Sequence, residues 1–431
     1  MVSSALVLAL LVGPSTALDN GLALTPPMGW NPWNCYGNRG EGVTEGIVLD
    51  AARAMASKLS GSGYAYVNLD CGWSTKHRDP ATGELQVNAT RFPHGMAWLA
   101  EQIHALGLKL GMYGALGYHQ CCSGSADATA DDGSGAGCSK SKPATCRNET
   151  FFARDAALWA SWGVDLVKFD GCGGKFHPDI DAMRDALNAT GRPIVYSVHS
   201  DVTEGGGMTD ADANLWRTGP DIGASYEQAL DRAMIADNVT AYLPAGPGAW
   251  ADPDMLQVGN IGRQANGGSP PSLFPDAEGR TQFALWSVLK APLLLGTFIH
   301  NVSGATLATV TNAAAIAVNQ DALGEPGTMR KDGGYLPDKP RPTGNVAYGY
   351  QIWSGALSNG GAAVVLANLE GNRSQPLTLS KDEMPPSRAG TAVWDVAEAF
   401  SGATMKSVTL PLAWPAVAPH DVAMLVLTPA V

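Results

Sequence analysis

The chain has 431 residues, of which 45% are hydrophobic and 16% are charged, and its formal net charge at pH 7 is −12. This composition is typical of a globular protein with one or two domains. The acidic balance leaves no basic patch that could neutralise phosphates, so a nucleic-acid partner is not expected. The 51 glycines and 28 prolines favour a loop-rich enzyme over a helical bundle.

The first 17 residues have the pattern of a secretory signal peptide. An apolar run over residues 5–12 precedes small residues, and Ser15 and Ala17 stand at the −3 and −1 positions of a cut after Ala17. The run is too short to span a bilayer, and no later stretch reaches about 18 apolar residues, so no membrane partner is expected. We therefore predict a protein that is secreted, or retained in a vacuole or lysosome.

Other features agree with the secretory route. All seven cysteines lie in the first half of the chain, where an oxidising compartment would favour disulfide bonds. They have no Cys-x-x-Cys pair and the histidines are scattered, so we expect neither a metal nor a cofactor. Six sequons predict a glycoprotein: Asn88, Asn148, Asn188, Asn238, Asn301 and Asn372.

From residue 28 to about 320, short apolar runs alternate with Ala/Leu-rich stretches of helical length. The runs are 28–30, 64–70, 108–113, 164–170, 193–197, 215–217, 249–254 and 292–297. The helical stretches are 43–60, 97–106, 151–162, 180–189, 226–238 and 280–291. Eight alternating units predict an α/β fold of the (β/α)8 TIM-barrel class. The doubly wound alternative lacks its Gly-x-Gly-x-x-Gly motif after a strand.

Beyond residue 321 the pattern changes to short apolar runs separated by Gly, Asn, Ser and Pro. The runs are 346–352, 362–369, 377–379, 392–394, 407–412 and 422–427. They predict a C-terminal antiparallel β-sandwich domain. The expected organisation is a signal peptide at 1–17, a catalytic barrel at 18–328 and the sandwich at 329–431.

Polar residues stand at the ends of the predicted barrel strands. Lys168 and Asp170 close the run 164–170, and they share one face because side chains two apart on a strand point the same way. Alone, this pair would be equally consistent with a surface ion pair. The other strand ends carry similar residues: Trp30, Asp70, Tyr113, His199, Arg217 with Asp221, and Asp252 with Asp254. In a barrel these ends form the active site.

Several carboxylates on one rim suit glycoside hydrolysis, which needs one as nucleophile or base and one as acid. Trp30 would offer an apolar face on which a sugar ring stacks. The cations Lys168 and Arg217 argue against a metal ion held by the same carboxylates. The acidity of the pocket argues against a phosphate ligand.

Seven segments also match the motifs of a known family in order: 25–31, 63–70, 106–113, 162–172, 245–250, 252–256 and 316–321. With the tail over 417–429, the chain resembles glycoside hydrolase family 27, which holds α-galactosidases and α-N-acetylgalactosaminidases. The resemblance implies a retaining double displacement, with Asp170 as nucleophile and Asp221 as acid/base, their carboxyl groups about 5–5.5 Å apart. Lys168 should keep Asp170 ionised. Asp221 must be protonated at the working pH, which predicts an acidic optimum.

The resemblance further implies which residues surround the sugar. The expected substrate-binding residues are Trp30, Asp70, Cys71, Tyr113, Cys121, Lys168, His199, Arg217 and Asp254. Two disulfide bonds are implied by the same resemblance, Cys35–Cys71 and Cys121–Cys172. The expected partner is an oligosaccharide or glycoconjugate with a terminal α-galactose, and a homodimer is left open.

The chain departs from the common family pattern in ways that bear on the sugar. Cys71 stands where many members have a second Asp, and Ala115 where an acidic residue is frequent. His199 replaces the Glu of a Cys-Glu-Trp motif whose position reads the C2 substituent, and it could donate to a 2-hydroxyl. We expect an α-galactosidase; the alternatives are a β-L-arabinopyranosidase, an α-N-acetylgalactosaminidase, or a galactose-binding lectin on an inactive barrel.

Overall fold

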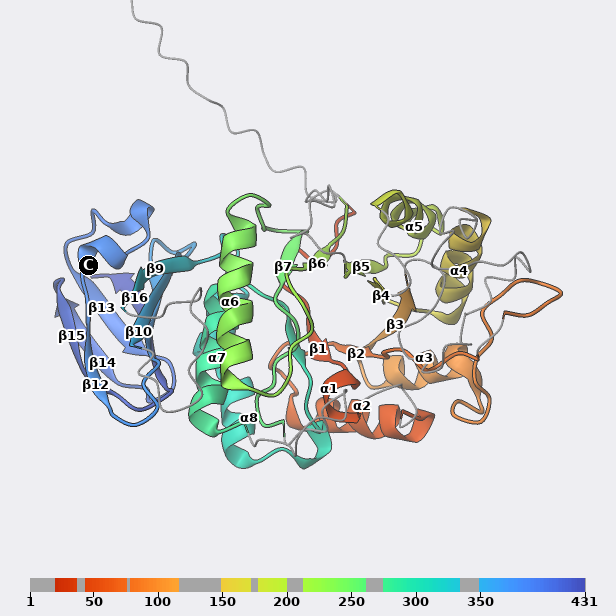
Figure 1. Cartoon of the computed structure of the whole chain (residues 1–431), viewed down its shortest axis with the longest axis horizontal. Coiled ribbons are helices and arrows are strands. Elements are labelled where there is room, and N and C mark those ends of the chain that lie inside the picture. The colour runs from red at the N-terminus through yellow and green to blue at the C-terminus, as the bar shows by residue number, and fades with distance from the viewer. Residues whose placement is uncertain are drawn as a thin grey trace, which may run out of the picture.

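The computed structural model describes residues 20–36, 43–75, 78–115, 149–171, 177–199, 212–260, 274–333 and 349–430. These residues form a parallel β-sheet with its helices, followed by an antiparallel β domain at the other end of the molecule (Figure 1). The predicted fold class, a TIM barrel followed by a β-sandwich, is confirmed. Among the described residues, no helix is long and apolar enough to cross a membrane.

The parallel sheet has eight strands in the order β7-β6-β5-β4-β3-β2-β1-β8. They are β1 (Met28–Trp30), β2 (Tyr66–Asn68), β3 (Lys109–Ala115), β4 (Leu166–Asp170), β5 (Val195–Val198), β6 (Leu215–Arg217), β7 (Trp250–Asp252) and β8 (Leu293–Leu295). A parallel bridge between Leu256, just after β7, and Leu295 of β8 joins the two ends of the sheet. Each run predicted as a strand overlaps one of these strands, although β3 and β5 extend one or two residues beyond the predicted ends.

Within the described ranges, helices follow every strand of this sheet except β5. They are α1 (Trp33–Tyr36), α2 (Glu45–Lys58), α3 (Gly95–Ala105), α4 (Glu149–Trp162), α5 (His177–Ala189), α6 (Tyr226–Thr240), α7 (Asp276–Val288), η4 (Ile299–Asn301), α8 (Gly304–Val310) and α9 (Ala313–Asn319). Several of these helices begin with a side-chain cap. Thr44 accepts from the backbone N–H of Ile47, and Ser225 from that of Gln228. Such caps satisfy N–H groups that lack a partner in the helix.

The C-terminal domain contains a six-stranded sheet and a two-stranded one. The large sheet has the order β14-β13-β16-β11-β10-β9, and β12 pairs with β15. The elements are β9 (Thr328–Asp332), β10 (Tyr350–Ala356), β11 (Ala362–Asn368), β12 (Gln375–Leu379), η5 (Lys381–Glu383), η6 (Pro386–Arg388), β13 (Trp394–Glu398), β14 (Thr404–Val408), β15 (Leu412–Val417) and β16 (Val422–Pro429). Side chains from both sheets form one buried core, which includes Leu366, Leu379 and Trp394.

In this domain the sequence prediction merged two strands and missed a third. The single strand predicted over 407–412 is the end of β14, a turn and the start of β15. Pro411 has no backbone N–H to donate to a sheet, which is consistent with a break at this point. The prediction also missed β9, whose five side chains are all partly or fully exposed and so give no buried periodicity.

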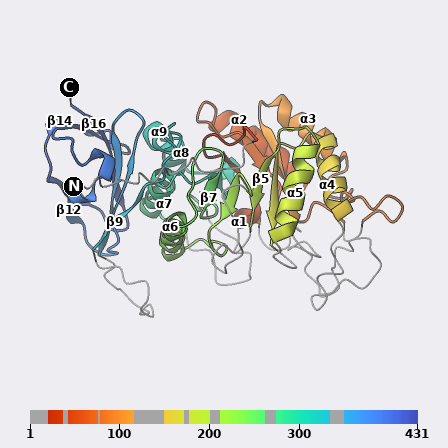
Figure 2. The ribbon, with the colours of Figure 1, turned by 90° about the horizontal axis from the view of Figure 1, so that it is seen from above.

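Helices α6–α9 lie between the parallel strands and the sandwich (Figure 2). Arg280 of α7 forms two bonds of 3.0 and 2.6 Å with the carboxylate of Asp421, at the start of the last strand. The adjacent His420 bonds Glu278 over 2.8 Å and stacks on Tyr226 of α6. The sandwich is therefore joined to the barrel through the two helices that follow β6 and β7.

Candidate active site

Strand β4 delivers two charged side chains to its carboxyl end. Val167 and Phe169 are buried in the core, whereas Lys168 and Asp170 alternate with them and face the barrel interior. Nζ of Lys168 lies 3.8 Å from Oδ2 of Asp170, and the backbone N–H of Gly171 donates to Oδ1 over 2.8 Å. The alternation of the sequence thus predicted this pair correctly.

Asp70 follows strand β2 and completes an ion pair with Lys168. Nζ of Lys168 donates to Oδ2 of Asp70 over 2.7 Å, and Nδ2 of Asn31 donates to the same oxygen over 3.1 Å. The backbone N–H of Cys71 donates to Oδ1 over 2.9 Å. Lys168 also lies over the ring of Tyr113, 5.4 Å from its centroid. Lys168 is therefore held between two carboxylates and an aromatic face.

These charges set the ionisation of the β4 pair. Burial raises the pKa of Asp170, but the charge of Lys168 and the hydrogen bond from His199 outweigh it and hold that pKa well below its usual range. Burial likewise opposes a charged Lys168, but Asp70 and Asp170 raise its pKa above the ordinary value. Asp170 is thus a carboxylate at any physiological pH, as a nucleophile requires.

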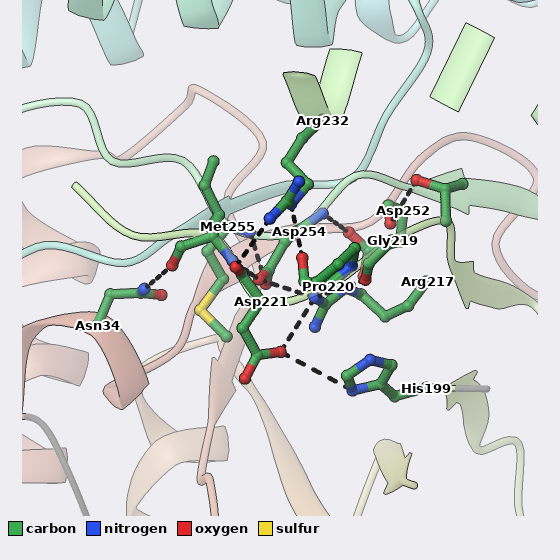
Figure 3. A network of polar contacts seen from close by, with 12 residues as sticks. Asn34, His199, Arg217, Gly219, Pro220, Asp221, Arg232, Asp252, Asp254 and Met255 are labelled. Atoms are coloured by element: carbon green, nitrogen blue, oxygen red, sulfur yellow. Dashed lines mark hydrogen bonds and ion pairs between the residues drawn. The ribbon is translucent and has the colours of Figure 1, made fainter. Parts of the chain in front are cut away.

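A second group of residues surrounds Asp221, in the loop between β6 and α6 (Figure 3). Nη2 of Arg217, the last residue of β6, donates to Oδ1 of Asp221 over 3.1 Å. The same nitrogen lies 2.9 Å from Oδ2 of Asp254, which also accepts the backbone N–H of Ile222 over 2.8 Å. Arg217 and Asp254 are both buried, whereas the side chain of Asp221 is 54% exposed. Asp221 is therefore an accessible carboxylate supported by a buried ion pair.

The charges around Asp221 do not favour the protonated form that the sequence analysis expected. Burial raises the pKa of Asp221, but Arg217, His199 and Lys168 together lower it below the usual value. The negative charge of Asp170 acts in the opposite direction. These charges thus favour the ionised form of Asp221, and a low pH or a ligand that excludes water would favour its acid form.

His199, at the end of β5, lies between the two carboxylates. Its Nδ1 is 2.8 Å from Oδ1 of Asp170 and 3.9 Å from Oδ1 of Asp221. The separation of those two oxygens cannot exceed the sum of these distances. That limit is consistent with the roughly 5–5.5 Å that separates the carboxyl groups of a retaining pair.

The predicted site residues separate into three groups. Lys168, His199, Arg217 and Asp254 line one pocket, and Asp70, Asp170 and Asp221 are bonded to residues that line it. Trp30 and Tyr113 are fully buried, and the indole of Trp30 donates to the backbone oxygen of Thr297. Trp30 therefore presents no open face for a sugar ring, contrary to expectation. Cys121 lies outside the described residues.

The pocket also contains polar residues that were absent from the predicted substrate-binding set. They are Asn31, Asn68, Ser197 and Asp252. Burial raises the pKa of Asp252 to about 6, even though Arg217 opposes this effect. Asp252 was already among the strand-end residues of the sequence analysis, and Asn31 directly follows β1, so the same rule could have selected it. Asn68 and Ser197 lie within strands, and only the barrel geometry reveals them.

The predicted Cys35–Cys71 disulfide is wrong. Cys35 is a free thiol, buried in α1, with its sulfur 3.5 Å from the backbone oxygen of Pro32. Burial raises its pKa to about 12. Cys71 is disulfide-bonded, but not to Cys35, and so offers a substrate no free thiol. The predicted Cys121–Cys172 pair lies outside the described residues.

Among the described residues, no group of three His, Cys, Asp or Glu side chains could hold a metal ion.

Two family models match the chain. The model described as alpha galactosidase A matches residues 25–321, and that of the alpha galactosidase C-terminal beta sandwich domain matches residues 347–427. The chain belongs to glycoside hydrolase family 27. It is therefore a glycoside hydrolase of the α-galactosidase family.

Individual relatives in family 27 are similar along most of the chain. It is 36% identical to an α-galactosidase of Coffea arabica, over 96% of each protein. It is also 36% identical to an α-N-acetylgalactosaminidase of Gallus gallus, over 77% of this chain and 79% of that protein. The solved structure of an α-galactosidase from Saccharomyces cerevisiae with raffinose superposes with a TM-score of 0.73, at 25% identity, over 97% of this chain and 100% of that one.

Proposed function

We propose that this enzyme removes terminal, non-reducing α-D-galactosyl residues by a retaining double displacement. The observation that carries the proposal is the bridge from Asp170 through His199 to Asp221, which limits the separation of the two carboxylates. The names of the plant and yeast relatives support galactose as the sugar.

In the first step, a carboxylate oxygen of Asp170 forms a bond to the anomeric carbon while the glycosidic bond breaks. Asp221 gives its proton to the departing oxygen. Bound sugar would cover the exposed Asp221, and loss of water raises the pKa of a carboxyl group. Substrate binding therefore favours the acid form that the neighbouring cationic side chains disfavour.

In the second step, water attacks the anomeric carbon of the glycosyl-enzyme, and the bond to Asp170 breaks. Asp221 now accepts the proton of that water. Once Asp170 is an ester, it carries no charge that could raise the pKa of Asp221. The pKa of Asp221 therefore falls, so the side chain is an ionised carboxylate, able to accept a proton, at the moment when the reaction needs one.

The remaining residues would hold the sugar hydroxyls. Lys168, Asp70, Arg217 and Asp254 supply charged donors and acceptors from four different strand ends. Charge-assisted hydrogen bonds are the strong ones, and the ion pairs among these residues fix their positions before substrate arrives. This arrangement supports an exo-acting enzyme that recognises a single terminal sugar.

We also propose that the protein is secreted, or retained in a vacuole or lysosome, as a glycoprotein. Four of the predicted sequon asparagines are exposed: Asn188, Asn238, Asn301 and Asn372. By contrast, Oδ1 of Asn88 accepts the backbone N–H groups of Thr90 and Arg91. Enzymatic deglycosylation followed by peptide mass mapping tests the proposal. Unmodified asparagine at all four exposed sequons, in protein from a secreting eukaryotic host, would contradict it.

The experiment that tests the activity is hydrolysis of p-nitrophenyl α-D-galactopyranoside near pH 4–6, a range in which a carboxylate pair can divide its roles. Asp170→Ala is the control. We expect turnover that is lost in the variant, and a first product with the α configuration by NMR. Faster hydrolysis of the β-L-arabinopyranoside or the α-N-acetylgalactosaminide would contradict galactose and assign that sugar as the substrate instead. Galactose binding without hydrolysis of any glycoside would support the lectin alternative.

A further inference from the structure

The loop that carries Asp221 is held almost entirely through its backbone. Four consecutive carbonyl oxygens, from Gly219 to Ile222, each accept a hydrogen bond from a side chain. Arg217 binds the first, Arg232 binds the second and third, and Asn34 binds the fourth. Side chains from three separate parts of the barrel therefore fix this short segment.

Arg232 makes two of these four bonds from the outer side of the loop (Figure 3). Its Nε donates to the carbonyl of Pro220 over 2.6 Å, and its Nη2 to the carbonyl of Asp221 over 3.2 Å. The aliphatic part of Arg232 and the side chain of Ile235 also border Gly219. Arg232 belongs to α6, whose N-terminal cap Ser225 begins directly after the loop.

The carboxylate of Asp221 itself has few contacts. Among the described residues its side chain touches Arg217 at 3.1 Å and lies 3.9 Å from His199, and half of it is exposed. A side chain so weakly packed takes its position from its backbone. Small misplacements of a catalytic group cost much of its effect, up to about 100-fold for 1 Å.

We infer that Arg232 is a positioning residue, which holds the acid/base Asp221 where its carboxyl group can protonate the glycosidic oxygen. The inference rests on the proposed function, because it assigns the acid/base role to Asp221. Arg232 is not among the residues that line the pocket, so a substitution there removes none of the groups proposed to bind the sugar. Arg232 differs in this respect from Arg217, whose side chain contacts the carboxylates of Asp221 and Asp254 directly.

The test compares substrates that differ in their need for an acid. A 2,4-dinitrophenyl α-galactoside releases a phenolate that leaves without a proton, whereas melibiose releases a sugar alkoxide that must be protonated. For Arg232→Met we expect kcat/KM to fall about 10-fold on melibiose and by no more than about 2-fold on the aryl substrate. Arg232→Lys retains the charge and one donor, and should restore part of the loss.

The matched control is Arg53→Met, which removes an exposed arginine on α2 whose partner is Asp50. It should change neither kcat/KM value. Thermal unfolding of each variant shows whether the fold is intact. Equal losses of kcat/KM on both substrates, or no loss, in a folded Arg232→Met enzyme would overturn the positioning role. A wild-type enzyme that hydrolyses neither galactoside would instead overturn the proposed function, and this inference with it.

Discussion

Nδ1 of His199 lies 2.8 Å from Oδ1 of Asp170, at the ends of neighbouring strands β5 and β4. Because Asp170 is ionised and can only accept, Nδ1 must carry the proton of this hydrogen bond. The imidazole therefore has a fixed orientation, and one oxygen of the nucleophile has a fixed donor. The family pattern places a glutamate here, which has no such donor when ionised.

The first prediction concerns the acid limb of the pH profile. Burial raises the pKa of Asp170, and Lys168 and His199 together overcome that effect. His199→Ala removes one of these two stabilising groups, so the pKa of Asp170 should rise. A smaller fraction of Asp170 will then be ionised at low pH. We expect the acid limb of kcat/KM against pH to move to higher pH, and kcat to fall about 10- to 100-fold. An unmoved acid limb would show that His199 does not influence the nucleophile.

The second prediction concerns the buried lysine of the site. Lys168→Met leaves Asp70 and Asp170 without their shared cation in a buried environment. Removing one partner of a buried ion pair typically costs about 3–5 kcal/mol. Urea unfolding should show a decrease of that order in the free energy of unfolding, together with loss of activity. Unchanged stability would mean that water enters the site and solvates both carboxylates.

The third prediction concerns the junction of barrel and sandwich. Arg280→Met removes two short bonds to Asp421, whose side chain is 14% exposed. We expect a loss of about 1–3 kcal/mol in the free energy of unfolding, since the charged partner stays partly buried. Neither Arg280 nor Asp421 lines the pocket, so kcat/KM should not change. Arg53→Met, at a pair with 64% and 69% exposed side chains, should cost less than about 1 kcal/mol.

The fourth prediction uses the pH dependence of stability. Lys290 is buried, with a backbone φ of 56°, and its Nζ donates to the carbonyl of Val318 near the end of α9. Burial lowers its pKa from 10.5 to about 8, although Asp321 opposes this. Between these two pH values the unfolded chain keeps a proton that the folded chain has lost, so this lysine makes stability rise with pH there.

The measurement is the free energy of unfolding of wild type minus that of Lys290→Met across this range. We expect the difference to increase by about 2–3 kcal/mol from pH 8 to 10.5. A difference that stays constant would show that Lys290 titrates alike in the folded and unfolded chains.

The sequence by itself determined the local elements and the residues at their ends. Apolar runs about five residues long with flanking turns predicted each barrel strand, and a period of two placed Lys168 and Asp170 on one face. Those rules operate within a few residues of chain, where backbone geometry alone decides the outcome. They failed for β9, which has no buried face, and at Pro411, where one apolar run contains two strands.

Only the tertiary structure decided which of these residues meet. Lys168 reaches Asp70 across 98 residues of chain, and Arg232 reaches back to Pro220 from a helix. Cys35 is a free thiol and Cys71 is disulfide-bonded to another residue, although the family resemblance had paired them. Contacts of this kind depend on the register of neighbouring strands and on how helices pack on them, which no local pattern specifies. The sequence therefore determined which groups were available for chemistry, and the packing determined their distances and charges.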